Sequence, residues 1–211
     1  MKTISLDSVI HVGTMDITRK HKYSLEGSGL SISLCPSAWQ RITRTEGDWN
    51  MLEKKNSKFL LATSLSQKDR LKIADWGIEH GYAEKTQTYA VVWFDMERDE
   101  DVEMVFATRE EAEREIDEDR EIEVRDETLV ATSKINEEVG YEISPLLTFD
   151  LLMTIYAEQN GYDGVYWDEE LDTSIMSAPR GVIANSKLSE WKVTRDKEYI
   201  NEHFKEMSDW D

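Results

Sequence analysis

The sequence predicts an α+β fold. Short stretches in which apolar and small polar residues alternate are typical of strands, and stretches with apolar residues three and four positions apart are typical of helices. Both kinds occur along the whole chain, which has 211 residues, 39% of them apolar, and can therefore bury a sizeable core. We expect a single domain, 1–211, with an acidic insertion at about 95–130. Four helices are expected, near 37–44, 67–80, 109–119 and 148–160.

The first expected elements are two strands and a helix. The apolar run from Val9 to Val12 ends at Gly13, as expected for a strand that enters a loop. Residues 27–34 alternate small polar and apolar side chains, which indicates a second strand. A short helix follows over 37–44, with Ser37 as its expected N-cap.

The middle of the chain alternates between strands and helices. Residues 47–65 are rich in strand formers, and the helix over 67–80 is expected to stop at Gly81. Tyr89 to Phe94 is the clearest strand pattern. Thr108 followed by glutamates predicts a capped helix start, and Glu121 to Val124 alternates like an exposed edge strand.

The C-terminal part places a cluster of carboxylates between two strands. An amphipathic helix over 148–160 is expected to end at Gly161, and the strand Val165 to Trp167 follows a turn. A second strand is expected at Gly181 to Ile183. The carboxylates after the first strand are Asp168, Glu169, Glu170 and Asp172. Such a cluster at a strand end can carry chemistry, although acidic hairpin tips are also common on an acidic chain.

Composition excludes several functional classes. The net charge is −19, which argues against direct binding to nucleic acid phosphates. No apolar run is long enough to span a membrane, and the start of the chain lacks the apolar stretch of a signal peptide, so we expect a cytoplasmic protein without membrane contact. The single cysteine, Cys35, excludes an internal disulfide, and the four scattered histidines predict no metal site.

The charge is concentrated in one segment. Between Asp95 and Glu127 there are 17 acidic and 5 basic residues, an excess of 12 negative charges out of 19. An acidic segment of this kind favours a basic partner.

Two separated segments resemble ADP-ribosyltransferase-like domains. His11-Val12-Gly13-Thr14 is similar to the histidine-glycine-threonine first strand of that group, and Gly29 to Ser33, with Ala38, is similar to its glycine and serine strand before a helix. Gly161 to Val165, the acidic loop and the strand at Gly181 to Ile183 resemble the C-terminal half of phage-associated members. The resemblance covers the two ends of the chain and leaves the middle third without a counterpart.

This resemblance implies two small, mostly antiparallel sheets around an NAD-type cleft with flanking helices. It also implies a mono-ADP-ribosyltransferase that uses NAD as substrate to modify a host macromolecule, as a phage counter-defence or host-takeover factor in the host cytoplasm. One carboxylate among Asp168, Glu169, Glu170 and Asp172 would stabilise the oxocarbenium-like transition state. The acidic insertion would then be the face that selects a basic host protein.

The remaining site residues follow from the same resemblance. His11 would bind a ribose hydroxyl, and Gly13 and Thr14 would let the backbone approach the nicotinamide amide. Ser31 and Ser33 would line the cleft. His11 and the two serines have simpler alternatives. His11 could be a strand-end histidine with one backbone partner, and the serines could be ordinary polar residues of an alternating strand.

Trp39 and Trp167 could stack on nicotinamide or adenine, or they could be core residues, the more common role of tryptophans at such spacing. Arg180 stands where many relatives place the catalytic glutamate, before the last strand. Either the carboxylate has moved to the loop that begins at Asp168, or catalysis is lost. Arg180 could hold the NAD pyrophosphate, or it could form a salt bridge on an acidic surface.

A different class of function stays open. A non-catalytic acidic protein could mimic DNA phosphates and occupy a basic surface of a host nucleic-acid-binding protein. The enzyme needs a cleft that contains His11, Ser31 and the acidic loop after Trp167, whereas the mimic needs only an extended array of carboxylates.

Overall fold

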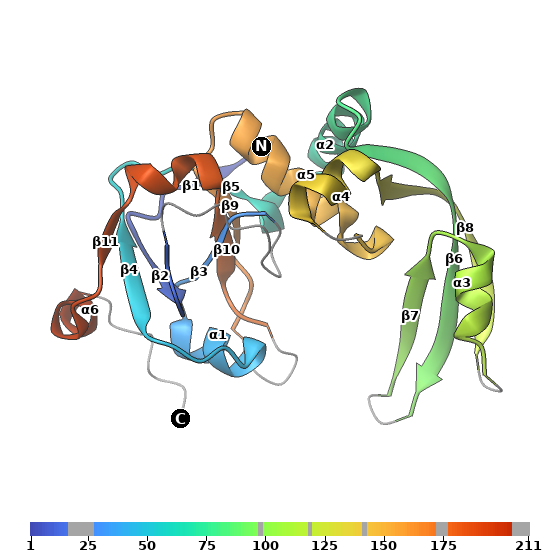
Figure 1. Cartoon of the computed structure of the whole chain (residues 1–211), viewed down its shortest axis with the longest axis horizontal. Helices are drawn as coiled ribbons and strands as arrows, with labels where there is room; N and C mark the ends of the chain where they lie inside the picture. Colours follow the sequence, from blue (N-terminus) through green and yellow to red (C-terminus); the bar gives the residue numbers. More distant parts are fainter. Residues whose placement is uncertain (17–27, 97–98, 118–119, 141–142, 172–176, 204–211) are drawn as a thin grey trace. The chain divides into compact units, whose positions relative to one another are not determined.

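A computed structural model describes the chain except for residues 17–27, 97–98, 118–119, 141–142, 172–176 and 204–211. The fold mixes helices with an eight-stranded and a three-stranded sheet (Figure 1). The chain forms two compact units. The first consists of Met1–Leu71 and Met153–Asp211, and the second of Lys72–Leu152.

The first unit is built on the eight-stranded sheet. Its order is β1-β5-β9-β10-β3-β2-β4-β11, and the paired strands run antiparallel except for β5 and β9, which are parallel. Figure 1 shows that strands from both ends of the sequence alternate in it. The strands are β1 Thr3–Ile4, β2 Ser8–Val12, β3 Leu30–Ser33, β4 Trp49–Glu53, β5 Phe59–Leu61, β9 Gly164–Trp167, β10 Arg180–Ile183 and β11 Lys192–Thr194.

Apolar side chains cover both faces of this sheet. One face carries the larger core cluster, in which the Phe59 ring packs against Tyr166 and Trp191 at centroid distances of 6.5 and 5.9 Å. The other face carries Ile10 and Met51, which pack against Ile200. Because successive side chains of a strand alternate between faces, the buried neighbours Val9 and Ile10 belong to different clusters.

The helical segments of the first unit are short. They are α1 Pro36–Thr43, η1 Ala62–Ser64, η2 Asn185–Glu190 and α6 Lys197–His203. Helix α1 begins at Pro36 rather than after Ser37, so the expected cap was wrong: Cys35 is the N-cap and provides no side-chain hydrogen bond. Proline is favoured at this first position because its missing N–H would have no partner in the helix.

The second unit is built on the three-stranded antiparallel sheet, in which β6 lies between β7 and β8. The expected strand at 89–94 is the end of a longer strand, and 121–124 does lie at an edge. The strands are β6 Ala83–Asp95, β7 Glu100–Phe106 and β8 Glu121–Ala131, and the helices are α3 Arg109–Arg114 and α4 Ser133–Val139. The chain enters this unit within α2 Gln67–Glu79 and leaves it within α5 Pro145–Gln159.

The α+β prediction is confirmed, with corrections. Helices are present at all four expected places, and the structure adds α4 and α6. The helix expected over 109–119 ends at Arg114, because the acids Glu115 and Asp117 oppose the helix dipole at a C-terminus. With eight strands, the sheet of the first unit is larger than expected. The acidic segment at about 95–130 lies within the second unit, which extends beyond it on both sides.

Candidate functional site

The turn from Gly161 to Gly164 has a structural role. Gly161 ends α5 in the left-handed region, with φ of 77°. A side chain on Gly164 would place its Cβ 1.8 Å from the Val182 carbonyl oxygen, so only glycine permits the contact between β9 and β10. Between them, the Asp163 amide donates to the Lys58 carbonyl at 2.8 Å, and the Asp163 carbonyl accepts from the Ala184 amide at 2.8 Å.

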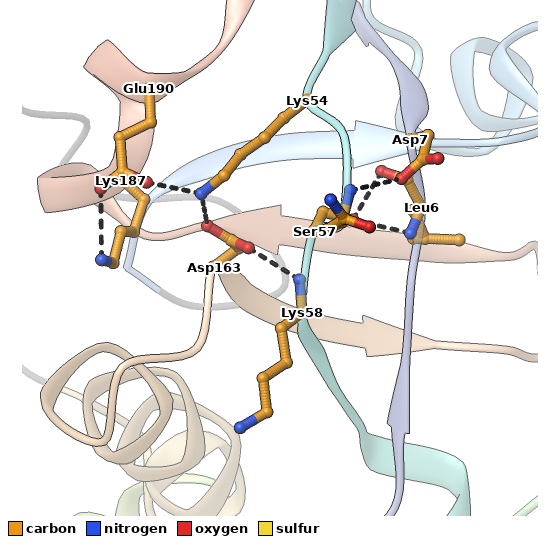
Figure 2. A network of polar contacts seen from close by, with 9 residues as sticks. Leu6, Asp7, Lys54, Ser57, Lys58, Asp163, Lys187 and Glu190 are labelled. Atoms are coloured by element: carbon orange, nitrogen blue, oxygen red, sulfur yellow. Dashed lines mark hydrogen bonds and ion pairs between the residues drawn. The ribbon is translucent and has the colours of Figure 1, made fainter.

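The Asp163 side chain lies at the centre of a polar network (Figure 2). Its buried carboxylate accepts a hydrogen bond from the Lys58 amide at 2.7 Å and forms an ion pair with the Lys54 ammonium. Lys54 also contacts Glu190 at 2.6 Å, and Lys187 contacts Glu190 at 3.2 Å. This carboxylate therefore anchors the turn before β9, and the structure gives it no open position for chemistry.

The network shifts the pKa values of Lys54 and Glu190. Burial by itself would lower the pKa of Lys54, but hydrogen bonds and charge from Asp163 and Glu190 outweigh burial and raise it above 10.5. Hydrogen bonds from Lys54 and then Lys187 lower the pKa of Glu190 below 4.5. Both shifts favour the charged forms that make the ion pairs.

Strand order brings the segments of the predicted site together. Strands β2, β3, β10 and β9 are consecutive neighbours in the sheet. Ser33 lies opposite Arg180, and Arg180 lies opposite Trp167, so residues far apart in sequence share one row. His11 and Ser31 are joined directly, because the His11 Nδ1 lies 2.8 Å from the Ser31 carbonyl oxygen.

The two predicted serines differ in their environment. Ser33 is fully buried; its hydroxyl donates to the Pro179 carbonyl at 2.6 Å and accepts from the Cys35 amide at 2.9 Å. These bonds connect the end of β3 to the start of β10. Ser31 is half-buried. Since Ile10 pairs with Ser33, strand alternation directs the serines to the Ile10 face and His11 to the opposite face.

Gly13 makes a close backbone crossing with Gly47. Its amide donates to the Asp48 carbonyl at 3.0 Å, and a Cβ on Gly47 would lie 2.6 Å from the Gly13 Cα. Gly13 was expected to let the backbone approach the nicotinamide amide. In the structure it lets the backbone approach Gly47 instead. Thr14 beside it is exposed. A hollow of 260 Å³ adjoins this crossing; it is lined by Gly47, Asp48, Trp49, Lys197, Ile200 and Asn201.

The carboxylates after β9 fall into two groups. Asp168 and Glu170 are exposed. Glu169 is half-buried; it forms an ion pair with Arg180 and accepts a hydrogen bond from the Ser177 hydroxyl at 3.1 Å. The fourth carboxylate, at position 172, lies outside the described residues. Glu169 is therefore the carboxylate of the three that polar contacts hold in place.

The salt-bridge alternative for Arg180 is the arrangement seen in the structure. Its guanidinium pairs with Glu169 and lies 5.7 Å from the centre of the Trp167 ring. Both expected stacking residues are core residues here. Trp39 packs with Cys35, Ala38 and Ala178, and Trp167 is 7% exposed.

The sequence patterns did not single out Tyr166. Its ring is fully buried over Gly181, where a Cβ would lie 2.7 Å from the Tyr166 Cδ2. Among the described residues its hydroxyl makes no hydrogen bond of normal distance and angle, although the Leu34 backbone lies close enough to act on it. Burial raises the pKa of this hydroxyl, as do the charges of Asp168 and Cys35, against a smaller opposing effect of the Leu34 backbone. A lone tyrosine in an apolar strand gives no sequence signal of this kind.

Comparison with protein-family models, with curated proteins and with solved structures finds no match. Within the described ranges, no group of three or more histidine, cysteine, aspartate or glutamate residues could hold a metal ion. In the same part of the chain, no helix is long and apolar enough to cross a membrane.

Proposed function

We propose that the first unit is a mono-ADP-ribosyltransferase that uses NAD as substrate and modifies a host macromolecule, with Glu169 as its transition-state carboxylate. The observation that carries the proposal is the position of Glu169. It is the second residue after β9, and contacts from Arg180 and Ser177 hold it at the end of the strands that resemble this group of enzymes.

The chemistry requires a fixed negative charge. When the bond between nicotinamide and ribose breaks, nicotinamide leaves with the bonding electron pair, and positive charge develops on the ribose. A carboxylate held beside that position stabilises the charge most when it does not have to reorganise. A nucleophilic atom of the target then forms the new bond to the ribose carbon and loses its proton. Contacts to Arg180 and Ser177 give Glu169 the fixed position that exposed Asp168 and Glu170 lack.

The hydrogen bond of His11 fixes its tautomer. A carbonyl oxygen can only accept a hydrogen bond, so the 2.8 Å contact to Ser31 places a proton on the His11 Nδ1. Strand alternation directs His11 to the face of the sheet opposite Ser33, and Arg180, the partner of Glu169, lies in the row of Ser33; His11 is therefore assigned no contact with NAD. Ser33 is assigned no role toward NAD, because its hydroxyl connects β3 to the start of β10.

The test combines binding and turnover on the whole chain. NAD should raise the melting temperature of the wild type, and labelled NAD should be consumed. Glu169→Gln should lower turnover by about a hundredfold while NAD binding changes little. The matched controls Asp168→Asn and Glu170→Gln remove the same charge from exposed neighbours and should keep most of the activity.

The outcomes separate the parts of the proposal. If Glu169→Gln keeps full activity, the carboxylate is misassigned. If the wild type neither binds nor consumes NAD, the transferase proposal fails as a whole. Ser177→Ala serves as a second variant, because it loosens Glu169 without removing its charge; we expect a smaller loss of turnover, about tenfold.

The acidic DNA mimic receives less support. A phosphate mimic needs an extended array of carboxylates spaced like the phosphates of a DNA strand. The acidic sheet of the second unit instead carries Val92 and the half-exposed Phe94 among its acids. Apolar residues among carboxylates suit the binding of a protein ligand. They suit the DNA-binding surface that a mimic would occupy less well.

A further inference from the structure

The three-stranded sheet of the second unit has one covered face. The connection from β7 to β8 includes α3, in which Ala112 is fully buried, and it ends at Arg120. The Arg120 guanidinium lies over the Trp93 ring, 4.6 Å from its centre. The connection therefore crosses β6 on the face that carries Trp93.

The opposite face, which we call the open face, has a regular composition. Strand pairing places Val92 between Glu103 and Glu121, and places Asp101 beside Phe94. An apolar strip along β6 is thus flanked by carboxylates from β7 and β8. The open face consists of Val92, Phe94, Asp101, Glu103, Glu121, Glu123 and Arg125, and Ala90 on the same side of β6 is fully buried.

The open face is hollowed and strongly acidic. A hollow of 570 Å³ lies on it, and its lining includes four carboxylates but a single guanidinium. Arg125 pairs with Glu123 and, at 3.3 Å, with Glu103. Within the described part of the chain, Asp101 and Glu121 form no ion pair. The hollow therefore has two carboxylates available to a cationic ligand.

The apolar strip is accessible. Half of the Phe94 surface is exposed, although phenylalanine is among the residues most often buried. It lies between Asp101 of β7 and the row of Glu103, Val92 and Glu121. Together with Val92 it forms an apolar patch that carboxylates surround, and apolar patches with a polar rim mark interaction sites.

We infer that the open face binds a segment of another protein that carries lysine or arginine side chains on both sides of an apolar one. Charge complementarity decides the class of occupant. The net charge of −19 repels nucleic acids, anionic membranes and a second copy of this chain, whereas it attracts a basic protein. The apolar residue would cover Phe94 and Val92, and the cationic groups would reach Asp101 and Glu121. This inference does not depend on NAD chemistry in the first unit.

The first experiment measures which chemistry the open face prefers. Three fluorescent twelve-residue peptides, of alternating lysine and leucine, lysine and serine, or glutamate and leucine, are titrated with the full chain in an anisotropy assay. The lysine–leucine peptide should bind about tenfold more tightly than the lysine–serine peptide, because only the former covers the apolar strip. The glutamate–leucine peptide should not bind. Equal affinity for the first two peptides overturns the inference, since general charge attraction would explain it.

The second experiment locates the site. The double variant Asp101→Asn/Glu121→Gln should weaken binding of the lysine–leucine peptide about tenfold and reduce the effect of salt on it. The control Glu79→Gln/Glu137→Gln removes the same charge from exposed positions on α2 and α4 and should bind like the wild type. If the control weakens binding equally, the open face is not the site.

The apolar strip is tested separately. Phe94→Ser should weaken the lysine–leucine peptide and leave the lysine–serine peptide unaffected. Equal effects on both peptides, or none, contradict a role for Phe94. Circular dichroism checks that each variant is folded, and the half-exposed position of Phe94 favours this.

Discussion

Replacing Lys54 with methionine removes an ammonium group but keeps most of its aliphatic stem. The ammonium joins β4 to the turn before β9 through Asp163, which lies 109 positions further along the chain. The Asp163 side chain is 6% exposed and that of Lys54 is 19% exposed. Lys54→Met therefore leaves a buried carboxylate without its cation.

The magnitude follows from what Asp163 retains. Breaking a buried ion pair from one side costs about 3–5 kcal/mol when no partner remains. Here the Lys58 amide still donates to the carboxylate at 2.7 Å, and Lys54 is partly solvated. We therefore expect the free energy of unfolding of the first unit to fall by about 2–3 kcal/mol. Asp163→Asn keeps an acceptor for that amide, so adding it to Lys54→Met should cost less than the sum of the two changes.

Urea unfolding, followed by circular dichroism and tryptophan fluorescence, measures the effect. The two units can unfold in separate transitions. The circular dichroism and fluorescence curves are therefore each fitted with one transition per unit. Lys192→Met is the matched control. Its ammonium lies 3.4 Å from Glu53 but is 72% exposed, and its removal should cost less than about 0.5 kcal/mol. If Lys54→Met destabilises the protein no more than Lys192→Met, the buried ion pair does not hold the turn.

Three other predictions concern single side chains. Tyr166→Phe removes a buried hydroxyl that makes no hydrogen bond of normal distance and angle among the described residues, and should stabilise the first unit by about 1 kcal/mol, seen as a higher melting temperature; a lower one would mean that its contact with the Leu34 backbone is a stabilising hydrogen bond. Thr108→Ala removes the cap that accepts from the Glu111 amide and should cost about 1 kcal/mol in urea unfolding of the second unit. Because the pKa of Glu190 is lowered, its contribution is present above pH 4.5 and lost as pH falls through the lowered value, so acidification should shrink the stability difference between wild type and Glu190→Gln.

Local signals predicted elements well where they were strong. The helix start after Thr108 was predicted from its cap and the glutamates that follow, and a capping box with Glu111 is present. The short helices α4 and α6, of seven residues each, were missed because they have few turns in which an apolar period could appear. The place of β9 and β10 in the sheet depends on pairing with strands more than 100 residues earlier, and no local pattern encodes it.

The candidate site, like the fold, could be predicted from local sequence only in part. A carboxylate cluster after Trp167 could be predicted, but the choice of Glu169 required the positions of Ser177 and Arg180. Asp163 stood in the most informative motif of the sequence, yet its partner Lys54 directly follows β4, 109 positions earlier in the chain. Whether a carboxylate is available for chemistry or occupied by structure depends on such long-range contacts.

The order of strands in the eight-stranded sheet has a consequence for how the protein folds as it is synthesised. The N-terminal segment supplies the pair β1 and β5 and the group β3, β2 and β4, while β9 and β10, which lie between them, are translated only after the second unit. Until those strands arrive, β5 and β3 each present an unpaired edge, which is a hazard for aggregation. The second unit has all its strands in one continuous segment and can fold earlier. We therefore expect a highly acidic folded unit to be attached to the growing chain during the interval in which the larger sheet is still open.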